Sequence, residues 1–65
     1  MIATIVLPEQ LKMKVKYEVI AEDVVIQEVY FNEYPVLNLL ISLNMLYGVD
    51  LTENIFTALM KKHDL

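Results

Sequence analysis

The stretch KMKVKYEVIAEDVVIQEVYF, residues 12–31, decides the fold because its pattern is that of a β-hairpin. Its first half alternates between charged and apolar residues, which is the period of a half-buried strand. Its second half is rich in β-branched and aromatic residues, which favour strands. Glu22 and Asp23 lie between the halves, and we expect them to form a two-residue turn. The stretch therefore predicts antiparallel strands over about 12–21 and 24–32.

A two-residue turn at this position would fix the register of the hairpin. It would place Val15 opposite Tyr30, and Tyr17 opposite Glu28, whose carboxylate could accept a hydrogen bond from the Tyr17 hydroxyl. The other face of the hairpin would carry a row of lysines, which we expect either to be solvated or to meet an acidic partner. The candidate partner-facing residues on this strand face are Lys12, Lys14, Lys16 and Phe31.

Upstream of the hairpin, the stretch IATIVL is apolar at every position but one. It predicts a strand over about 2–7 that is buried on both faces or paired centrally. Pro8 follows and fits the second position of a type I turn. A helix that opens at Glu9 is the alternative, but the strict alternation from Lys12 onward argues against it.

Downstream of the hairpin, two stretches predict α-helices. Pro35 suits the first position of a helix over about 35–47, and Gly48 suits the residue after its end. Asp50 can cap a second helix over about 51–62, with Glu53 at the capping-box spacing. The chain, residues 1–65, is therefore expected to be a single α+β domain. It would consist of a three-stranded antiparallel meander followed by two helices packed on one face of the sheet.

The first predicted helix is apolar nearly all the way round. The arc expected to pack on the sheet is Val36, Leu39, Leu40, Leu43, Leu46 and Tyr47. The corresponding stripe on the second helix is Leu51, Ile55, Ala58 and Leu59. Each helix keeps a second apolar patch, which we expect to face another chain; the alternative is that the two helices cover each other's patches. The candidate interface residues are Leu37, Ile41, Asn44, Phe56 and Met60.

Chain length and composition also favour self-association. A chain of 65 residues builds only a marginal core, although 57% of its residues are hydrophobic. It contains no cysteine, so it cannot form a disulfide or a cysteine-based zinc site. We therefore expect a homodimer, in which two copies of Asn44 could pair and fix the register of the interface.

Catalytic and cofactor-binding patterns are absent from the sequence. Gly48 is the only glycine, so there is no phosphate-binding loop. Ser42 is placed within a helix, and the only histidine, His63, lies near a terminus that we expect to fray. We therefore expect no enzyme, no metal site and no cofactor. The net charge of −4, the short apolar segments and the lack of a signal-peptide pattern predict a cytoplasmic protein with no membrane association and an unfavourable charge for nucleic acid.

One resemblance to a known family concerns the helix junction. In YGVDLTENIFTALM, residues 47–60, a glycine and an N-cap separate two helices that follow a strand, an order that resembles the ribbon-helix-helix repressors. The resemblance implies DNA binding through polar or basic residues of the strand before the first helix. Here that strand carries Val25, Gln27, Val29 and Phe31 on one face, and Val24, Ile26, Glu28 and Tyr30 on the other. We therefore do not assign the chain to that family.

The sequence favours a small, acidic, non-enzymatic protein-binding module that acts as a homo-oligomer. Short proteins without catalytic residues are often inhibitors or modulators of a larger protein, including those that phages and mobile elements encode. We expect this role, with a protein partner that the sequence does not identify. The alternative function is that of a small dimeric DNA-binding transcriptional regulator.

Overall fold

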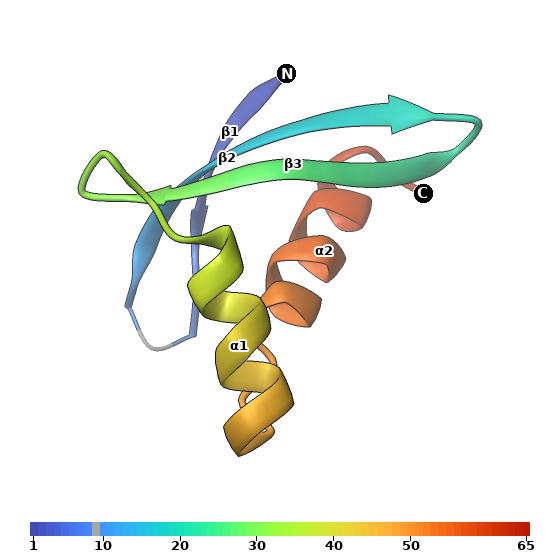
Figure 1. Ribbon diagram of the computed structural model, residues 1–65. Helices are drawn as coiled ribbons and strands as arrows, with labels where there is room; N and C mark the ends of the chain where they lie inside the picture. Colours follow the sequence, from blue (N-terminus) through green and yellow to red (C-terminus); the bar gives the residue numbers. More distant parts are fainter. Residues whose placement is uncertain (9) are drawn as a thin grey trace.

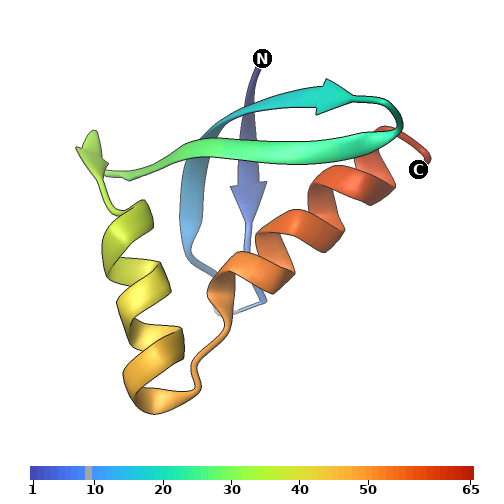
Figure 2. The ribbon, with the colours of Figure 1, turned by 45° about the vertical axis from the view of Figure 1, so that its right-hand side comes forward.

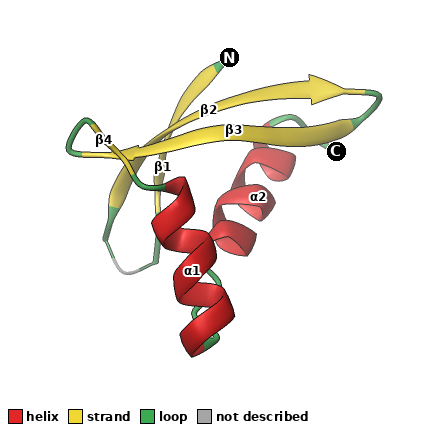
Figure 3. Cartoon of the chain, viewed as in Figure 1, coloured by secondary structure: helices red, strands yellow, loops and turns green. Residues whose placement is uncertain are grey.

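The computed structural model describes residues 1–8 and 10–65 and has the α+β fold that the sequence predicts (Figure 1). Its elements, in chain order, are β1 (Ile2–Val6), β2 (Lys12–Ile20), β3 (Asp23–Phe31), β4 (Tyr34–Pro35), α1 (Leu37–Tyr47) and α2 (Leu51–Lys62). The strands form one antiparallel sheet in the order β1-β2-β3-β4, and the two helices follow it in the chain (Figure 3). The sheet thus has four strands instead of three, because the short β4 precedes α1.

The first strand lies at the edge of the sheet and not at its centre. Ala3 and Ile5 are buried, whereas Ile2 and Val6 are 66% and 61% exposed. The expectation that this strand is buried on both faces is therefore wrong. The reason is topological: β1 pairs with β2 alone among the described strands, and the helices contribute to the core on only one face. Pro8 lies in a turn closed by a 2.8 Å hydrogen bond from Gln10 N to Leu7 O; Glu9 lies outside the described residues.

The turn of the main hairpin falls one residue earlier than predicted. Ala21 and Glu22 have φ angles of +51° and +66°, and Ile20 pairs with Asp23. Positive φ at both central residues is the geometry that matches the twist of a two-residue hairpin. The sequence carries no glycine here to indicate that geometry, so the predicted position at Glu22 and Asp23 is wrong.

A β-bulge then changes the register along the hairpin. Tyr17 pairs with Ile26 while Lys16 pairs with Glu28, so Gln27 is an extra residue in β3. Beyond the bulge Val15 pairs with Val29. The predicted pairs of Val15 with Tyr30 and of Tyr17 with Glu28 are therefore both wrong.

A second tight hairpin connects β3 to β4. Asn32 and Glu33 have φ angles of +50° and +70°, and Phe31 pairs with Tyr34 across them. Pro35 consequently lies in β4 and pairs with Tyr30, so α1 begins two residues later than the sequence predicts.

Glu28, at the bulge, connects β3 to the start of α1. Its carboxylate oxygen Oε1 accepts hydrogen bonds from the backbone N–H of Val29 at 2.9 Å and of Leu37 at 3.1 Å. Leu37 is the first residue of α1, and Val36 before it has no polar side chain. The predicted bond from Tyr17 to Glu28 is thus replaced by a cap on the helix that follows.

The other helix ends agree with the sequence. Gly48 ends α1 with φ +68°, in the left-handed region that glycine enters without a steric cost. The Asp50 side chain caps α2, because its Oδ1 accepts from the Glu53 N–H at 2.9 Å and from the Thr52 hydroxyl at 3.0 Å. The second helix therefore occupies the range 51–62 that was predicted for it.

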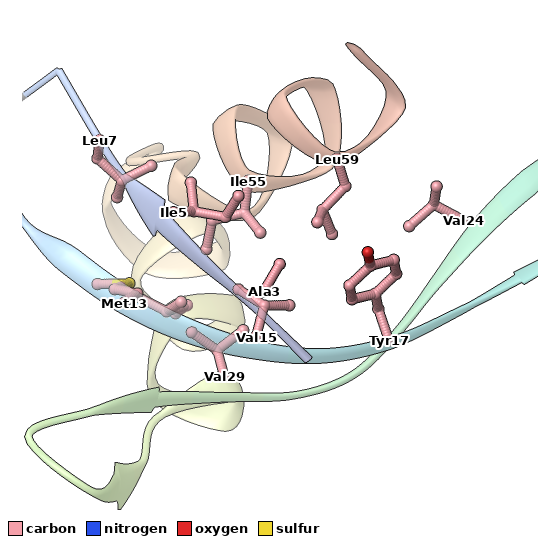
Figure 4. Packing of buried hydrophobic residues seen from close by; sticks show 11 residues of the cluster. Ala3, Ile5, Leu7, Met13, Val15, Tyr17, Val24, Val29, Ile55 and Leu59 are labelled. Carbon is pink, nitrogen blue, oxygen red and sulfur yellow. The ribbon is translucent and has the colours of Figure 1, made fainter. Parts of the chain in front are cut away.

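The core lies between the sheet and the helices (Figure 4). It consists of Ala3, Ile5, Leu7, Met13, Val15, Tyr17, Val24, Val29, Leu40, Ile55 and Leu59. Of these, Ile55 and Leu59 come from α2, whereas Leu40 is the only buried residue of α1, all of which is described. The second helix therefore contributes two buried side chains to the core, and the first helix contributes one.

The C-terminal end of α2 is fixed to the sheet. His63 Nε2 lies 2.6 Å from the hydroxyl of Tyr17, whose side chain is only 2% exposed. The two rings also meet edge to face, with their centroids 5.4 Å apart. The expectation that His63 lies in a fraying end is therefore wrong; the histidine gives a buried tyrosine hydroxyl its partner.

Candidate interaction surfaces

The first candidate surface is the exposed apolar side of α1. This helix runs away from the sheet, so its C-terminal half extends beyond the strands (Figures 1 and 2). Leu39, Leu46 and Tyr47, which the sequence assigns to the core, are exposed. That assignment is wrong because a helical wheel assumes a helix lying along the sheet, whereas α1 contacts it mainly through its first turns. The exposed apolar residues of this surface, called here the α1 face, are Leu39, Ile41, Met45, Leu46 and Tyr47.

An apolar crevice extends the α1 face onto the sheet. It has a volume of about 130 Å³ and lies between the start of α1 and the adjoining ends of β2 and β3. Its lining residues are Leu11, Met13, Phe31, Val36, Leu39 and Leu40. Leu39 thus belongs both to the crevice and to the α1 face, which makes the two surfaces continuous.

The residues predicted to form an interface divide between exposed and half-buried positions. Ile41 and Asn44 are exposed on α1. Leu37, Phe56 and Met60 are half-buried and pack against the core of their own chain. The second patch of α2 is therefore partly covered within the chain, while α1 keeps most of its apolar surface exposed. Met45, Leu46 and Tyr47 were not among the predicted interface residues.

The second candidate surface is the outer face of the sheet, opposite the helices. A groove of about 610 Å³ is lined there by Ile2, Thr4, Lys12, Met13, Lys14, Lys16, Tyr30, Asn32 and Glu33. The three lysines that the sequence predicts to share a face are therefore together in one concave surface. Three of the five basic residues of this acidic chain lie in the groove.

The aromatic neighbour of these lysines differs from the one predicted. Because of the bulge, Lys14 pairs with Tyr30, whereas Phe31 lines the crevice beside α1. Phe31 therefore belongs to the apolar surface, and Tyr30 belongs to the lysine groove. No sequence signal identifies the bulge, since Gln27 is an ordinary strand residue in the pattern.

Neither surface has the features of a metal or catalytic centre. Within residues 1–8 and 10–65, no three histidine, cysteine, aspartate or glutamate side chains lie close enough to hold a metal ion. Ser42 is exposed on α1, while His63 contacts Tyr17. Among the helices described, none is both long and apolar enough to cross a membrane.

Comparisons with known proteins add no further constraint on these surfaces. No protein-family model matches the chain, and no curated protein and no solved structure is found to be similar to it.

Proposed function

We propose that this chain is a small protein-binding module that forms a homodimer through the α1 face. The observation that carries the proposal is the exposure of five large apolar side chains on one short helix. Their exposed fractions are 57% for Leu39, 43% for Ile41, 79% for Met45, 73% for Leu46 and 75% for Tyr47. Exposed apolar surface concentrated on one element in this way is typical of an interaction site.

The size of the α1 face is sufficient for a dimer. Its exposed fractions together amount to about three whole side chains, and burying one such side chain contributes about 1.5–3 kcal/mol. A two-fold interface buries the same patch on both copies, so the apolar contribution is at most about 10–20 kcal/mol, reached only if all five side chains are covered. This compares favourably with an association cost of about 4–15 kcal/mol.

A second copy of the chain suits this surface because of its charge distribution. No charged residue lies between Glu33 and Asp50, although the chain has a net charge of −4. Two α1 faces can therefore meet without placing like charges against each other. An isologous pair also supplies its own complementary apolar surface. The role proposed for the dimer is to bind and modulate a larger protein, as an inhibitor does.

The test compares two substitutions of exposed apolar residues by lysine. Leu46→Lys changes the α1 face, and Ile20→Lys changes a residue that is 54% exposed at the end of β2. Light scattering coupled to gel filtration should give the parent chain and Ile20→Lys about twice the chain mass of 7.6 kDa. Leu46→Lys should give the monomer mass with an unchanged circular dichroism spectrum. A monomeric parent chain, or equal masses for the two variants, would overturn the proposal.

The alternative of a DNA-binding regulator predicts a different result. The strand immediately before α1 is β4, and neither Tyr34 nor Pro35 is basic. A mobility shift with duplex DNA at low salt would favour the regulator, and its absence at micromolar protein would favour the protein-binding module.

A further inference from the structure

The outer edge of β1 presents backbone N–H and C=O groups that do not pair with β2. The hydrogen bonds between β1 and β2 show which residues carry them. Met1 and Tyr17 exchange backbone hydrogen bonds of 2.8 and 2.9 Å, and Leu7 N donates to Leu11 O at 2.9 Å. In an antiparallel pair such bonded positions alternate with non-bonded ones. The N–H and C=O groups of Ala3 and Ile5 therefore point toward β2. Those at the even positions, Ile2, Thr4 and Val6, point to the opposite side, where no described strand pairs with them.

This edge lacks the usual protection against strand addition. Natural proteins guard an edge strand with charged residues, proline or a bulge. The residues of β1 are Ile-Ala-Thr-Ile-Val, and its register with β2 is continuous from Ile2 to Val6. The strand is thus an open template for another extended segment.

A row of lysines runs parallel to this edge on the outer face of the sheet. Lys16 lies opposite Ile2, Lys14 opposite Thr4, and Lys12 opposite Val6. An added strand would lie about 10 Å from β2, a separation that a lysine and a carboxylate side chain can bridge from either side. The row repeats every two residues, at roughly 6.8 Å, which is also the repeat of alternate side chains in an added strand.

We infer that the free edge of β1 binds an extended acidic segment of a partner protein by strand addition. The segment would hydrogen-bond to the backbone at Ile2, Thr4 and Val6. It would place an acidic residue at every second position, over the groove that holds Lys12, Lys14 and Lys16. This inference rests on the proposed protein-binding function and names the chemistry of the partner. It uses a surface separate from the α1 face.

Charge complementarity favours an acidic segment over a second copy of the chain as the strand that pairs with the free edge of β1. A second β1 would bring Ile2, Thr4 and Val6 to the outer face, none of which carries a charge. The lysine row would then face no opposite charge from the added strand. An acidic strand supplies one carboxylate for each lysine, and such complementarity gives specificity. The α1 face remains available for the dimer in either case.

The test uses a capped, fluorescent heptapeptide, Glu-Val-Glu-Val-Glu-Val-Glu, and its analogue with glutamine at the acidic positions. Fluorescence anisotropy should show binding of the acidic peptide that weakens as salt rises, since exposed charges are screened. The glutamine analogue should bind at least roughly tenfold more weakly, equivalent to one charge contact of about 1.4 kcal/mol. Equal binding of both peptides, or no binding of either, would overturn the inference.

Two substitutions of the same residue test the backbone contact. Thr4→Pro removes an N–H that points away from β2, and proline is tolerated in an edge strand at such a position. It should weaken acidic-peptide binding roughly tenfold while preserving the fold, whereas Thr4→Val, which keeps the N–H, should bind as the parent chain does. Equal affinities for Thr4→Pro and Thr4→Val would overturn the inference.

Oligomeric state separates this inference from the proposed dimer. Thr4→Pro should leave the dimer mass unchanged, because the α1 face is intact. Leu46→Lys should abolish the dimer and leave peptide binding unchanged. If Thr4→Pro instead produced monomers, β1 would pair with a second copy, and the acidic-segment inference would be overturned. Equal competition by a single-stranded oligonucleotide and by unlabelled acidic peptide would overturn it as well.

Discussion

Glu28→Ala should lower the free energy of unfolding by about 2 kcal/mol. The Oε1 atom of Glu28 accepts from Val29 N at 2.9 Å and from Leu37 N at 3.1 Å, so one side chain serves the bulge and the first turn of α1. Removing an N-cap costs about 1 kcal/mol, and a hydrogen bond to a charged group contributes about 1.5–3 kcal/mol. We expect a value near 2 kcal/mol because Glu28 is half-buried, so water can partly replace the lost carboxylate as a hydrogen-bond acceptor.

Urea unfolding, followed by far-ultraviolet circular dichroism, measures this change. A loss of 2 kcal/mol also corresponds to a fall in Tm of about 8–16 °C for a domain of this size. Glu28→Gln keeps an oxygen acceptor but loses the charge near the helix N-terminus, so it should cost about half as much. Glu18→Ala, on the exposed side of β2, is the matched control and should stay within about 0.5 kcal/mol of the parent chain.

Hydrogen exchange localises the effect. If the carboxylate caps α1, the amides of the first turn of α1 should exchange faster in Glu28→Ala, with little change in the β1–β2 ladder. The reasoning would be refuted if Glu28→Ala and Glu18→Ala were equally stable, or if exchange in α1 were unchanged.

Three further substitutions test other parts of the fold. Glu22→Gly should raise stability by about 1 kcal/mol in thermal melts, because Glu22 has φ +66° at a tight turn; a loss of stability would contradict this. Ala3→Pro should unfold the chain, whereas Thr4→Pro should remain folded in circular dichroism spectra. The reason is that the Ala3 N–H points toward β2 and the Thr4 N–H points away from it. Equal stability of the two variants would refute this assignment of the backbone hydrogen bonds. Tyr17→Phe should cost about 1 kcal/mol in urea unfolding, since it removes the partner of His63; an unchanged midpoint would show that this hydrogen bond contributes nothing.

The sequence predicts elements well where one local pattern determines them. The alternation from Lys12 onward predicts β2 because a period of two fits only a half-buried strand. Gly48 and Asp50 predict the helix junction, since a left-handed C-terminal residue and a capping carboxylate are local requirements of the backbone. The lysine row follows from the same alternation, so the position of the groove was predictable in part.

The register could not be predicted, because it depends on two residues without a distinctive signal. The turn uses Ala21 at φ +51°, which glycine or asparagine would have indicated more clearly. The bulge at Gln27 lets both Val24 and Val29 be buried, although they are an odd number of residues apart. Only the packing of the whole core selects this arrangement.

The exposure of the α1 face could not be predicted from the sequence pattern either. A helical wheel assigns Leu39 and Leu46 to the same arc as Leu40. The helix leaves the sheet after its first turns, and its direction is fixed by contacts with β3 and α2 and by the hydrogen bond from Leu37 N to Glu28. The lack of any charged residue in residues 34–49, which include α1, does indicate an interface. This sequence feature does not depend on the direction in which α1 runs.

The contact between Tyr17 and His63 gives the protein an intrinsic optical reporter. The chain has no tryptophan and four tyrosines, all in the described part of the structure. Of these, Tyr17 is buried, Tyr30 is half-buried, and Tyr34 and Tyr47 are exposed. A near-ultraviolet circular dichroism band requires an aromatic ring held in a fixed asymmetric setting, and it is lost in molten states. In the monomeric Leu46→Lys variant, where Tyr47 stays exposed, that band should therefore arise chiefly from Tyr17. It should vanish when the end of α2 detaches from the sheet, even while the far-ultraviolet spectrum still records helices and strands.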